Sequence, residues 1–155
     1  MAVNRSRLAR DSRQICIQME QMANQYLAAA DVTGVQAQML LYILRHSETG
    51  ASVTDLHQVS GYSKATISNL IKRLREKGYV RVEPCREDDR RRLLFSTEKG
   101  QCVQNFLADS IRGAEDSLYQ GFSPEELSTL DHLQKRMLRN LAVFQTHSQR
   151  EASAT

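Results

Sequence analysis

The sequence is poor in the residues that interrupt helices. Its 155 residues include no tryptophan, two prolines and seven glycines, while Leu, Gln, Arg, Ala and Glu are abundant. This inventory argues against a strand-rich sandwich and favours a mostly α-helical protein. A chain of this length accommodates one compact domain, and a content of 41% hydrophobic and 25% charged residues is typical of folded globular proteins.

The signals of several other protein classes are missing. No run approaches the roughly 18 consecutive apolar residues of a membrane span, and the first residues contain no apolar signal core. We therefore expect a cytoplasmic protein. Cys16, Cys85 and Cys102 fit neither a disulfide framework nor a CxxC metal clip, so reduced thiols are expected. The four histidines are scattered, which argues against a metal site.

Motifs of catalysis are missing as well. The sequence contains no nucleophile elbow, no glycine-rich phosphate loop and no pair of carboxylates suited to acid–base chemistry. Asp88 and Asp89 are adjacent and would point to opposite faces of a strand. We therefore expect neither an enzyme nor a bound cofactor.

Positive charge is concentrated in one segment. The formal net charge of the chain is only +3, but Lys64–Arg92 contains ten Lys and Arg residues against five Asp and Glu residues. A local basic excess is what a surface that meets phosphate groups requires. This segment is the first candidate for a nucleic-acid contact.

Apolar residues at helical spacing predict two helices before this segment. The first runs from about Ser6 to Ala30 and is ended by the sequence Asp31–Gly34. The second begins near Val35 and is ended by the sequence Ser47–Gly50.

The next stretch has the order of a helix-turn-helix. Ser52 is a typical N-cap of a short helix, with Asp55 three residues later in the place of a capping-box acid. The turn follows at Ser60–Tyr62, and Ser63 caps a longer helix that ends at Lys77–Gly78. The side chains expected to face inwards are Val53, Leu56 and Val59 in the short helix, and Ile67, Leu70, Ile71 and Leu74 in the longer one.

A charged hairpin follows. The runs Tyr79–Val82 and Leu93–Phe95 predict its two strands. Its tip, Glu83–Arg92, is too charged to pack in a core and has to project outwards. In this position the hairpin is a wing.

Two further helices complete the chain. Thr97–Gly100 opens a long helix that continues to Leu118. Ser123, followed by a proline and two acids, caps the last one. Its apolar stripe reaches Phe144, and the chain is predicted to fray from Gln145 onwards.

With these elements in place, the sequence resembles the MarR family of bacterial transcription regulators over nearly its whole length. The most specific portion runs from Gly78 through Asp88-Asp-Arg90 to Thr97-Glu-Lys-Gly100, with an Asp-x-Arg at the wing tip and a Thr-x-x-Gly before the next helix. One departure is Ser96, where family members usually carry an apolar residue, so the inward register of the second wing strand stays open. The resemblance implies a winged helix-turn-helix fold with six helices and a homodimer.

The helix after Ser63 is expected to read DNA. Its outward arc carries short polar and cationic side chains, and a helix of this width fits the major groove of B-DNA. Asn69 is suited to adenine, whereas Lys72 and Arg73 are suited to guanine or phosphate. The residues expected to contact double-stranded DNA are Ser63, Lys64, Ala65, Thr66, Ser68, Asn69, Lys72 and Arg73 of the helix, and Arg86, Asp88, Arg90, Arg91 and Arg92 of the wing.

In the wing, the resemblance implies that Arg90 inserts into the minor groove. Asp88, two residues away on the same face, is expected to hold the guanidinium of Arg90 in one rotamer. Arg86, Arg91 and Arg92 are expected to add phosphate contacts that salt weakens.

The apolar stripes of the first, fifth and sixth predicted helices predict a homodimer that reads a pseudo-palindromic operator. We expect a dimerisation region at 1–32 and 98–147, a DNA-binding region at 33–97 and a flexible tail at 148–155. By resemblance the protein is expected to be a repressor released by a small aromatic or phenolic effector. Candidate effector-lining residues are Tyr26, Met39, Tyr42 and Arg45.

Two alternatives stay open. A winged helix can serve as a protein-interaction adaptor that never touches DNA, although the basic wing argues against it. Some relatives sense oxidants through a thiol near the start of the first helix, but Cys16 lies deeper and is expected to be packed, whereas Cys85 is expected to be exposed. Whether Cys16, Cys85 or Cys102 is redox-active stays open.

Overall fold

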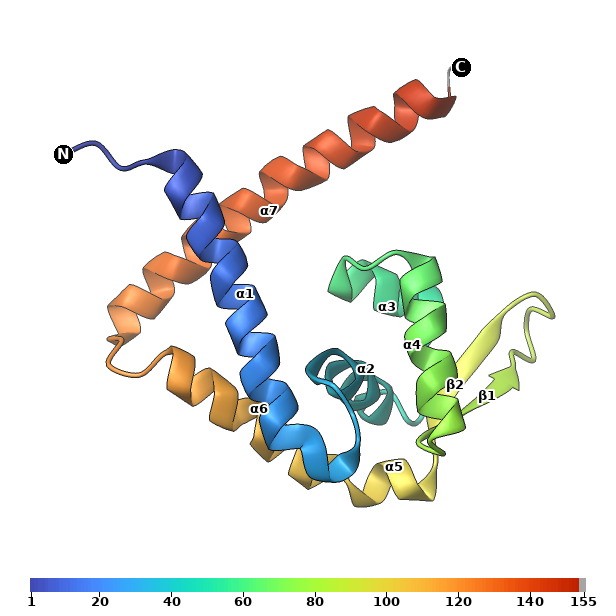
Figure 1. Cartoon of the computed structure of the whole chain (residues 1–155). Helices are drawn as coiled ribbons and strands as arrows, with labels where there is room; N and C mark the ends of the chain where they lie inside the picture. Colours follow the sequence, from blue (N-terminus) through green and yellow to red (C-terminus); the bar gives the residue numbers. More distant parts are fainter. Residues whose placement is uncertain (154–155) are drawn as a thin grey trace. The chain divides into compact units, whose positions relative to one another are not determined.

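Capped helices make up most of the chain (Figure 1). The computed structural model describes residues 1–153, and their side chains except those of 148, 149 and 151–153. The chain forms two compact units, Met1–Leu118 and Tyr119–Thr155, which are described separately. In chain order the elements are α1 (Arg5–Leu27), the 3₁₀ turn η1 (Ala28–Ala30), α2 (Gly34–Arg45), α3 (Val53–Ser60), α4 (Lys64–Glu76), β1 (Val80–Pro84), β2 (Arg92–Ser96), α5 (Glu98–Cys102), α6 (Gln104–Leu118) and α7 (Pro124–Ser153).

The first two helices begin and end close to where their sequences predict. Asn4 caps α1, and Asp31 ends η1 in the left-handed region with φ 54°. Thr33 caps α2 through a capping box with Gln36. The carboxamide of Asn24 also accepts the N–H of Gly34 at 2.7 Å, which joins the end of α1 to the start of α2.

The helix-turn-helix prediction is confirmed in detail. Ser52 and Asp55 form the predicted capping box of α3. Gly61 ends α3 with φ 75°, a conformation that glycine adopts without strain, and Ser63 then caps α4. Ile67, Ile71 and Leu74 are buried as predicted. Val59, predicted to face inwards, is 62% exposed.

The wing is an antiparallel pair, β1 with β2, in which Arg81 is opposite Phe95 and Val82 is opposite Leu94. Both strands are longer than predicted, because β1 reaches Pro84 and β2 starts at Arg92. In β2, Leu94 and Ser96 face inwards. The register left open by Ser96 is thereby settled: the serine takes the buried place, and its hydroxyl has no hydrogen-bond partner among the described residues.

The long helix predicted after Thr97 is divided in two. Thr97 caps α5, which ends at Val103, and α6 starts at Gln104. Gly100 is required in α5, because a Cβ at this position would lie 2.6 Å from the carbonyl oxygen of Tyr79. The six predicted helices are thus present within residues 1–153, the fifth as two.

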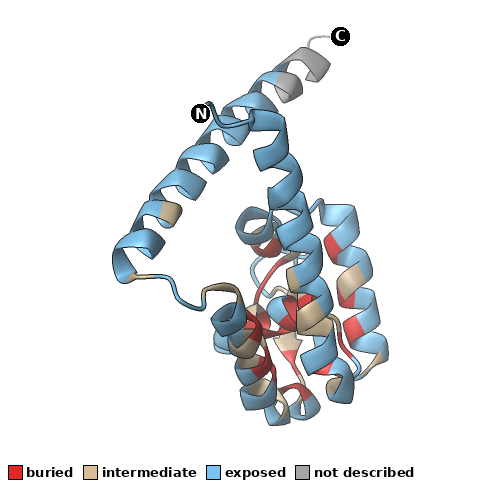
Figure 2. Ribbon diagram, turned by 60° about the vertical axis from the view of Figure 1, so that its left-hand side comes forward, coloured by how far each residue is buried: buried red, intermediate tan, exposed pale blue. Residues whose placement is uncertain are grey.

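A single hydrophobic core lies in the first unit (Figure 2). Helices α1 and α6 pack against each other, and α2 packs against both of them and against α4. The fully buried large side chains are Leu27, Leu40, Ile43, Leu56, Ile67, Leu74 and Leu107. This core holds α4 with one face inwards, so its opposite face is available to solvent.

The second unit is dominated by α7. Ser123, the residue before Pro124, forms a capping box with Glu126: each backbone N–H donates to the side chain of the other residue. The helix is pale blue, that is exposed, over nearly all of its described length in Figure 2. It continues to Ser153, beyond residue 148, where the flexible tail is predicted to begin; residues 154 and 155 lie outside the described chain.

None of the described helices is by itself long and apolar enough to cross a membrane; one bent pair, Arg5–Ala30 with Gly34–Arg45, meets that criterion by length and composition alone.

Candidate nucleic-acid interface

The outer face of α4 displays the predicted side chains to solvent. Six of them are exposed, and their side chains form no hydrogen bond or ion pair with other groups of residues 1–153: Lys64, Ala65, Ser68, Asn69, Lys72 and Arg73. Their neighbours Ser63 and Thr66 are exposed too, but their hydroxyls are engaged, because Ser63 Oγ accepts the N–H of Thr66 and donates to Thr66 Oγ1 at 2.9 Å. Ser63 therefore acts first as the helix cap.

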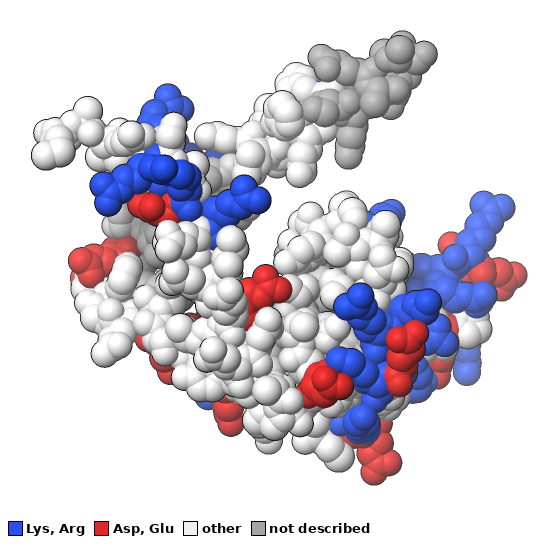
Figure 3. Space-filling model, viewed as in Figure 1, with Lys and Arg blue, Asp and Glu red and all other residues white. Residues whose placement is uncertain are grey.

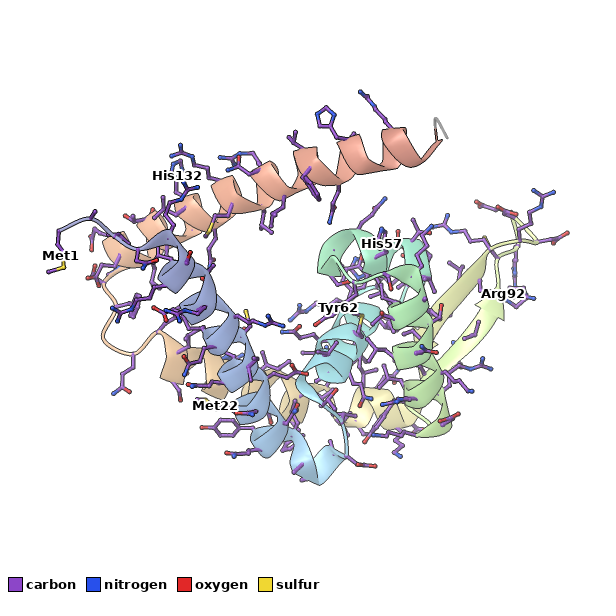
Figure 4. The ribbon with its side chains drawn as sticks, turned by 45° about the horizontal axis from the view of Figure 1, so that its top comes forward. Met1, Met22, His57, Tyr62, Arg92 and His132 are labelled. Atoms are coloured by element: carbon purple, nitrogen blue, oxygen red, sulfur yellow. The ribbon has the colours of Figure 1, made fainter. Side chains whose placement is uncertain are left out.

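Basic side chains continue from α4 onto the wing. Figure 3 shows Lys and Arg gathered over these two elements, with a few acidic groups between them. All five predicted wing residues, Arg86, Asp88, Arg90, Arg91 and Arg92, are exposed, and Arg92 is labelled in Figure 4. Both parts of the predicted surface therefore belong to the first unit.

A tight turn forms the wing tip. The N–H of Arg91 donates to the carbonyl oxygen of Asp88 at 3.0 Å, and the N–H of Cys85 donates to the carbonyl oxygen of Arg91 at 2.9 Å. The carboxylate of Asp88 accepts the backbone N–H of Arg90 at 3.0 Å. This corrects the sequence prediction: Asp88 orients the backbone at Arg90, and its carboxylate is not within ion-pair distance of the guanidinium.

Two contacts attach the wing to the start of α3. Ala51 and Leu94 exchange backbone hydrogen bonds of 3.0 and 2.7 Å. Nearer the tip, Arg91 Nη2 lies 3.5 Å from Ser52 Oγ and 3.9 Å from Asp55 Oδ2. The wing is therefore held at its base and at one point closer to its tip.

Asp55 is a fixed anion beside these arginines. The pKa of Asp55 is lowered below its ordinary value of 3.8, chiefly because its carboxylate accepts a hydrogen bond from the backbone N–H of Ser52. Burial raises this pKa, whereas the Ser52 hydroxyl and the Arg91 charge lower it further. Asp55 is thus ionised at neutral pH.

A hollow of about 580 Å³ separates the wing from α3 and includes residues that the sequence analysis missed. It is lined by Ser52, Val53, Thr54, Asp88, Arg90, Arg91 and Arg92. Sequence patterns identify Ser52 as a helix cap, but its place beside the wing depends on the pairing of Ala51 with Leu94, which no local spacing reveals.

The joint between α4 and the wing is held by polar contacts to η1. The phenol of Tyr79 donates to the carbonyl oxygen of Ala30 at 2.6 Å. Lys77 contacts the carbonyl and the carboxylate of Asp31, and Lys99 donates to the carbonyl oxygen of Lys77 at 2.6 Å. The C-terminal end of α4 is therefore fixed to the end of the first helix.

A hydrogen bond from the His57 side chain stabilises the turn between α3 and α4. Its Nδ1 lies 2.6 Å from the carbonyl oxygen of Tyr62, and both residues are labelled in Figure 4. Because a carbonyl oxygen only accepts, Nδ1 carries the hydrogen in this contact. The turn thus has a side-chain support in addition to the cap at Ser63.

Three of the four candidate effector residues share a cavity of about 290 Å³. Met39, Tyr42 and Arg45 line it together with residues of α3 and α6, among them Val59 and Glu115. Met39 is buried, with 3% of its surface exposed. Tyr26 does not line this cavity; its ring lies beside Gly113 on α6.

The cysteines differ from expectation at two positions. Cys16 is exposed, which overturns the prediction of a packed thiol, and it lines a second cavity of about 280 Å³ with Met19 and Glu20. Cys85 is half-buried rather than fully exposed, and Cys102 is exposed.

Comparison with known proteins agrees with this geometry. A sequence profile described as MarR family matches residues 30–91, which include α2 to α4 and most of the wing. The chain is 30% identical over 107 residues to the transcriptional activatory protein BadR of Rhodopseudomonas palustris, covering 68% of this chain and 61% of BadR. It is 26% identical over 102 residues to the uncharacterised HTH-type transcriptional regulator YybA of Bacillus subtilis, covering 65% of this chain and 68% of YybA.

Solved structures extend the likeness. The DNA complex of S. aureus MepR superposes with a TM-score of 0.80 at 25% identity, covering 90% of this chain and 99% of MepR. The curated relatives are matched over only about two thirds of their length. These relatives are named transcriptional regulators, and the chain, with its capped helix pair and charged hairpin, is similar in sequence to the MarR family and has the same winged helix-turn-helix fold as MepR.

Proposed function

We propose that this regulator binds double-stranded DNA sequence-specifically, with α4 in the major groove and the wing loop in the minor groove. The observation that carries the proposal is the outer face of α4, where exposed polar and cationic side chains have no hydrogen-bond or ion-pair partner within residues 1–153, while a buried stripe anchors the opposite face in the core. Side chains without internal partners keep their donors and acceptors for base edges and phosphates. The solved DNA complex of MepR, which shares the fold, supports the same use of the surface.

Each part of the surface has its own task in this proposal. Asn69 pairs with adenine, Ala65 meets a thymine methyl group, and Ser68 and Thr66 reach base edges or phosphate. Lys64, Lys72 and Arg73 bind phosphate or guanine, and Ser63 positions the helix start. In the wing, Arg90 enters the minor groove while Arg86 and Arg92 contact phosphates.

The proposed DNA-binding form is a homodimer, with residues 33–97 binding DNA and the terminal helices joining the subunits. In α7 the exposed side chains include Leu133, Met137, Leu138 and Leu141, which are 45–65% exposed. In α1, Leu8 and Ile15 are 55% and 47% exposed. A second copy offers the same apolar faces, so two-fold pairing buries them and spaces two α4 helices for a pseudo-palindromic operator.

The dimer is tested by sedimentation. The intact chain is expected to sediment as a dimer at micromolar concentration, and Leu141→Glu to shift it towards monomer, because an unpaired carboxylate is costly in an apolar interface. Glu125→Gln, a charge change at the solvent-exposed start of α7, serves as the control. A monomeric wild-type chain contradicts this part of the proposal.

An effector site is proposed in the cavity lined by Met39, Tyr42 and Arg45. The cavity has aromatic and aliphatic walls, with a cation at Arg45 and a carboxylate at Glu115, and such a lining suits a small aromatic or phenolic ligand. Because Leu56, Val59 and Ser60 of α3 form the wall facing α2 and α6, an occupant bears directly on the helix that precedes α4. Salicylate at millimolar concentration is the probe, and it is expected to weaken DNA binding of wild type more than that of Arg45→Ala.

The sign of regulation proposed is repression, in a cytoplasmic protein. BadR is named an activatory protein, which makes activation the competing outcome. A reporter placed downstream of a selected operator separates the two, because repression lowers its expression and activation raises it.

Selection from a random duplex library tests the central proposal. We expect enrichment of a pseudo-palindrome whose half-sites lie about one helical turn apart. The double variant Asn69→Ala/Arg90→Ala is the matched control and is expected to lose the enrichment while folding normally, because both side chains are exposed. A wild-type chain that enriches no sequence and binds duplex no better than the control contradicts the proposal and favours a protein-interaction adaptor.

A further inference from the structure

Arg91 stands apart from the other wing arginines in its contacts. Among Arg86, Arg90, Arg91 and Arg92, it alone has a guanidinium with a polar partner within residues 1–153. The partners are the N-cap Ser52 and Asp55 of α3. Both distances, 3.5 Å to Ser52 Oγ and 3.9 Å to Asp55 Oδ2, are measured from the same nitrogen, Nη2. The side chain thus joins the wing loop to the start of α3.

The backbone of Arg91 ties the loop together. Its carbonyl oxygen accepts from Cys85 on the opposite side of the loop, and its N–H donates to Asp88. Arg90 lies directly before it and is held by Asp88 through its own N–H. A movement of Arg91 therefore moves the turn that carries Arg90.

The acceptor that meets Arg91 is fixed in advance. Asp55 Oδ2 accepts the N–H of Ser52 at 2.9 Å, and Ser52 Oγ accepts the N–H of Asp55 at 3.1 Å. The side chains of Arg91 and Asp55 are 52% and 36% exposed, and an ion pair so exposed adds little to folding stability. The consequence of the contact therefore falls on the orientation of the loop.

From this geometry we infer that Arg91 is a positioning residue of the DNA interface: it locks the wing loop onto Ser52 and Asp55 so that Arg90 is presented to the minor groove. The inference rests on the proposed function and deepens it. It assigns Asp55, an acid beside the basic surface, a supporting part in DNA binding.

Removal of the Asp55 charge should change DNA affinity in the direction opposite to the one that net charge alone predicts. A carboxylate close to bound phosphate repels it, so removal of the Asp55 charge would strengthen DNA binding if only net charge mattered. If Asp55 holds Arg91, its removal weakens binding instead. Asp55→Asn is suited to this test, because the amide oxygen still accepts the N–H of Ser52 and keeps the cap.

The first experiment is a double-mutant cycle on a selected duplex. Arg91→Ala and Asp55→Asn are each expected to weaken binding by a similar factor, on the order of threefold or more, and the double variant to be no weaker than either single one. Arg92→Ala is the matched control for the loss of one positive charge and is expected to add its effect to that of Asp55→Asn. If Asp55→Asn tightens binding or leaves it unchanged, while Arg91→Ala behaves like Arg92→Ala, Arg91 is an ordinary phosphate contact and the inference is overturned.

The second experiment needs no DNA. Hydrogen exchange of the Cys85 and Arg91 amides, measured in the free full-length chain, reports whether the loop is closed. We expect both Arg91→Ala and Asp55→Asn to speed this exchange at least a few-fold, and Arg92→Ala to leave it unchanged. Unchanged exchange in both variants overturns the inference even if DNA affinity falls. If wild type binds no duplex at all, the proposed function fails, and the exchange rates still decide whether Arg91 holds the loop.

Discussion

The two halves of the proposed interface are built differently. Helix α4 is positioned by Ile67, Ile71 and Leu74, which are buried in the core, and its outer side chains from Ser68 to Arg73 have no hydrogen-bond or ion-pair partner in the described part of the chain. The wing loop buries little and is positioned by a backbone bridge at Ala51 and by the contacts of Asp88 and Arg91. Substitutions in α4 are therefore expected to affect either folding or DNA binding. In the loop, by contrast, a polar side chain such as Arg91 both holds the loop in place and contributes charge to the DNA-binding surface.

The largest effect is expected inside α4. Ile67→Ala leaves a cavity under the helix and is expected to lower the free energy of unfolding by about 2–5 kcal/mol, because Ile67 is fully buried. Urea unfolding followed by circular dichroism measures it. A decrease in unfolding free energy of less than about 1 kcal/mol would contradict the contrast between α4 and the wing loop, since α4 would then not depend on its buried stripe.

A change at the wing tip is expected to act on binding alone. Arg90→Ala should weaken binding to the selected operator by about 1–3 kcal/mol if the guanidinium reads the minor groove. Its unfolding midpoint in urea should match that of wild type, because the guanidinium is exposed. Equal affinity of variant and wild type for the operator would show that the wing makes no groove contact.

At the joint of the two regions, Tyr79→Phe is expected to cost about 1 kcal/mol of unfolding free energy at neutral pH, since the hydrogen bond to Ala30 is lost. Burial and, secondarily, the Asp31 carboxylate raise the pKa of Tyr79 above its ordinary value of 10.0. A raised pKa contributes stability below pH 10, which is lost as the pH rises through the folded value. The difference between wild type and variant in urea titrations should therefore narrow above pH 10; a constant difference would contradict this.

The smallest effect is expected at the rim of α4. Lys72→Ala should weaken binding to all duplexes alike and make the slope of log K against log salt concentration shallower by about one. Filter binding of operator and unrelated duplex measures both. A decrease in affinity confined to the operator would show instead that Lys72 contacts a base, and would assign it to the base-reading residues of α4.

Local sequence signals predicted much of this arrangement. The caps at Ser52, Ser63 and Ser123 are formed by hydrogen bonds between residues three apart, so spacing alone reveals them. The buried stripe of α4 follows from helical periodicity for the same reason.

What the sequence did not predict depends on contacts between distant residues. The break of the fifth helix at Val103 and the pairing of Ala51 with Leu94 have no local signature. The exposure of Val59 was also not predicted, because Val59 lines a cavity beside α2 and α6 that the pattern of a single helix does not reveal. At Asp88 the predicted residue was right but its partner was wrong, since a two-residue spacing in a tight turn brings the carboxylate to the backbone N–H of Arg90.

The salt dependence of duplex binding by the intact chain tests most directly whether α4 and the wing together meet DNA. With several Lys and Arg side chains on phosphates, the association constant is expected to fall by about 10³-fold or more between 50 and 200 mM salt. Binding that is absent, or that stays level across this range, would contradict the account.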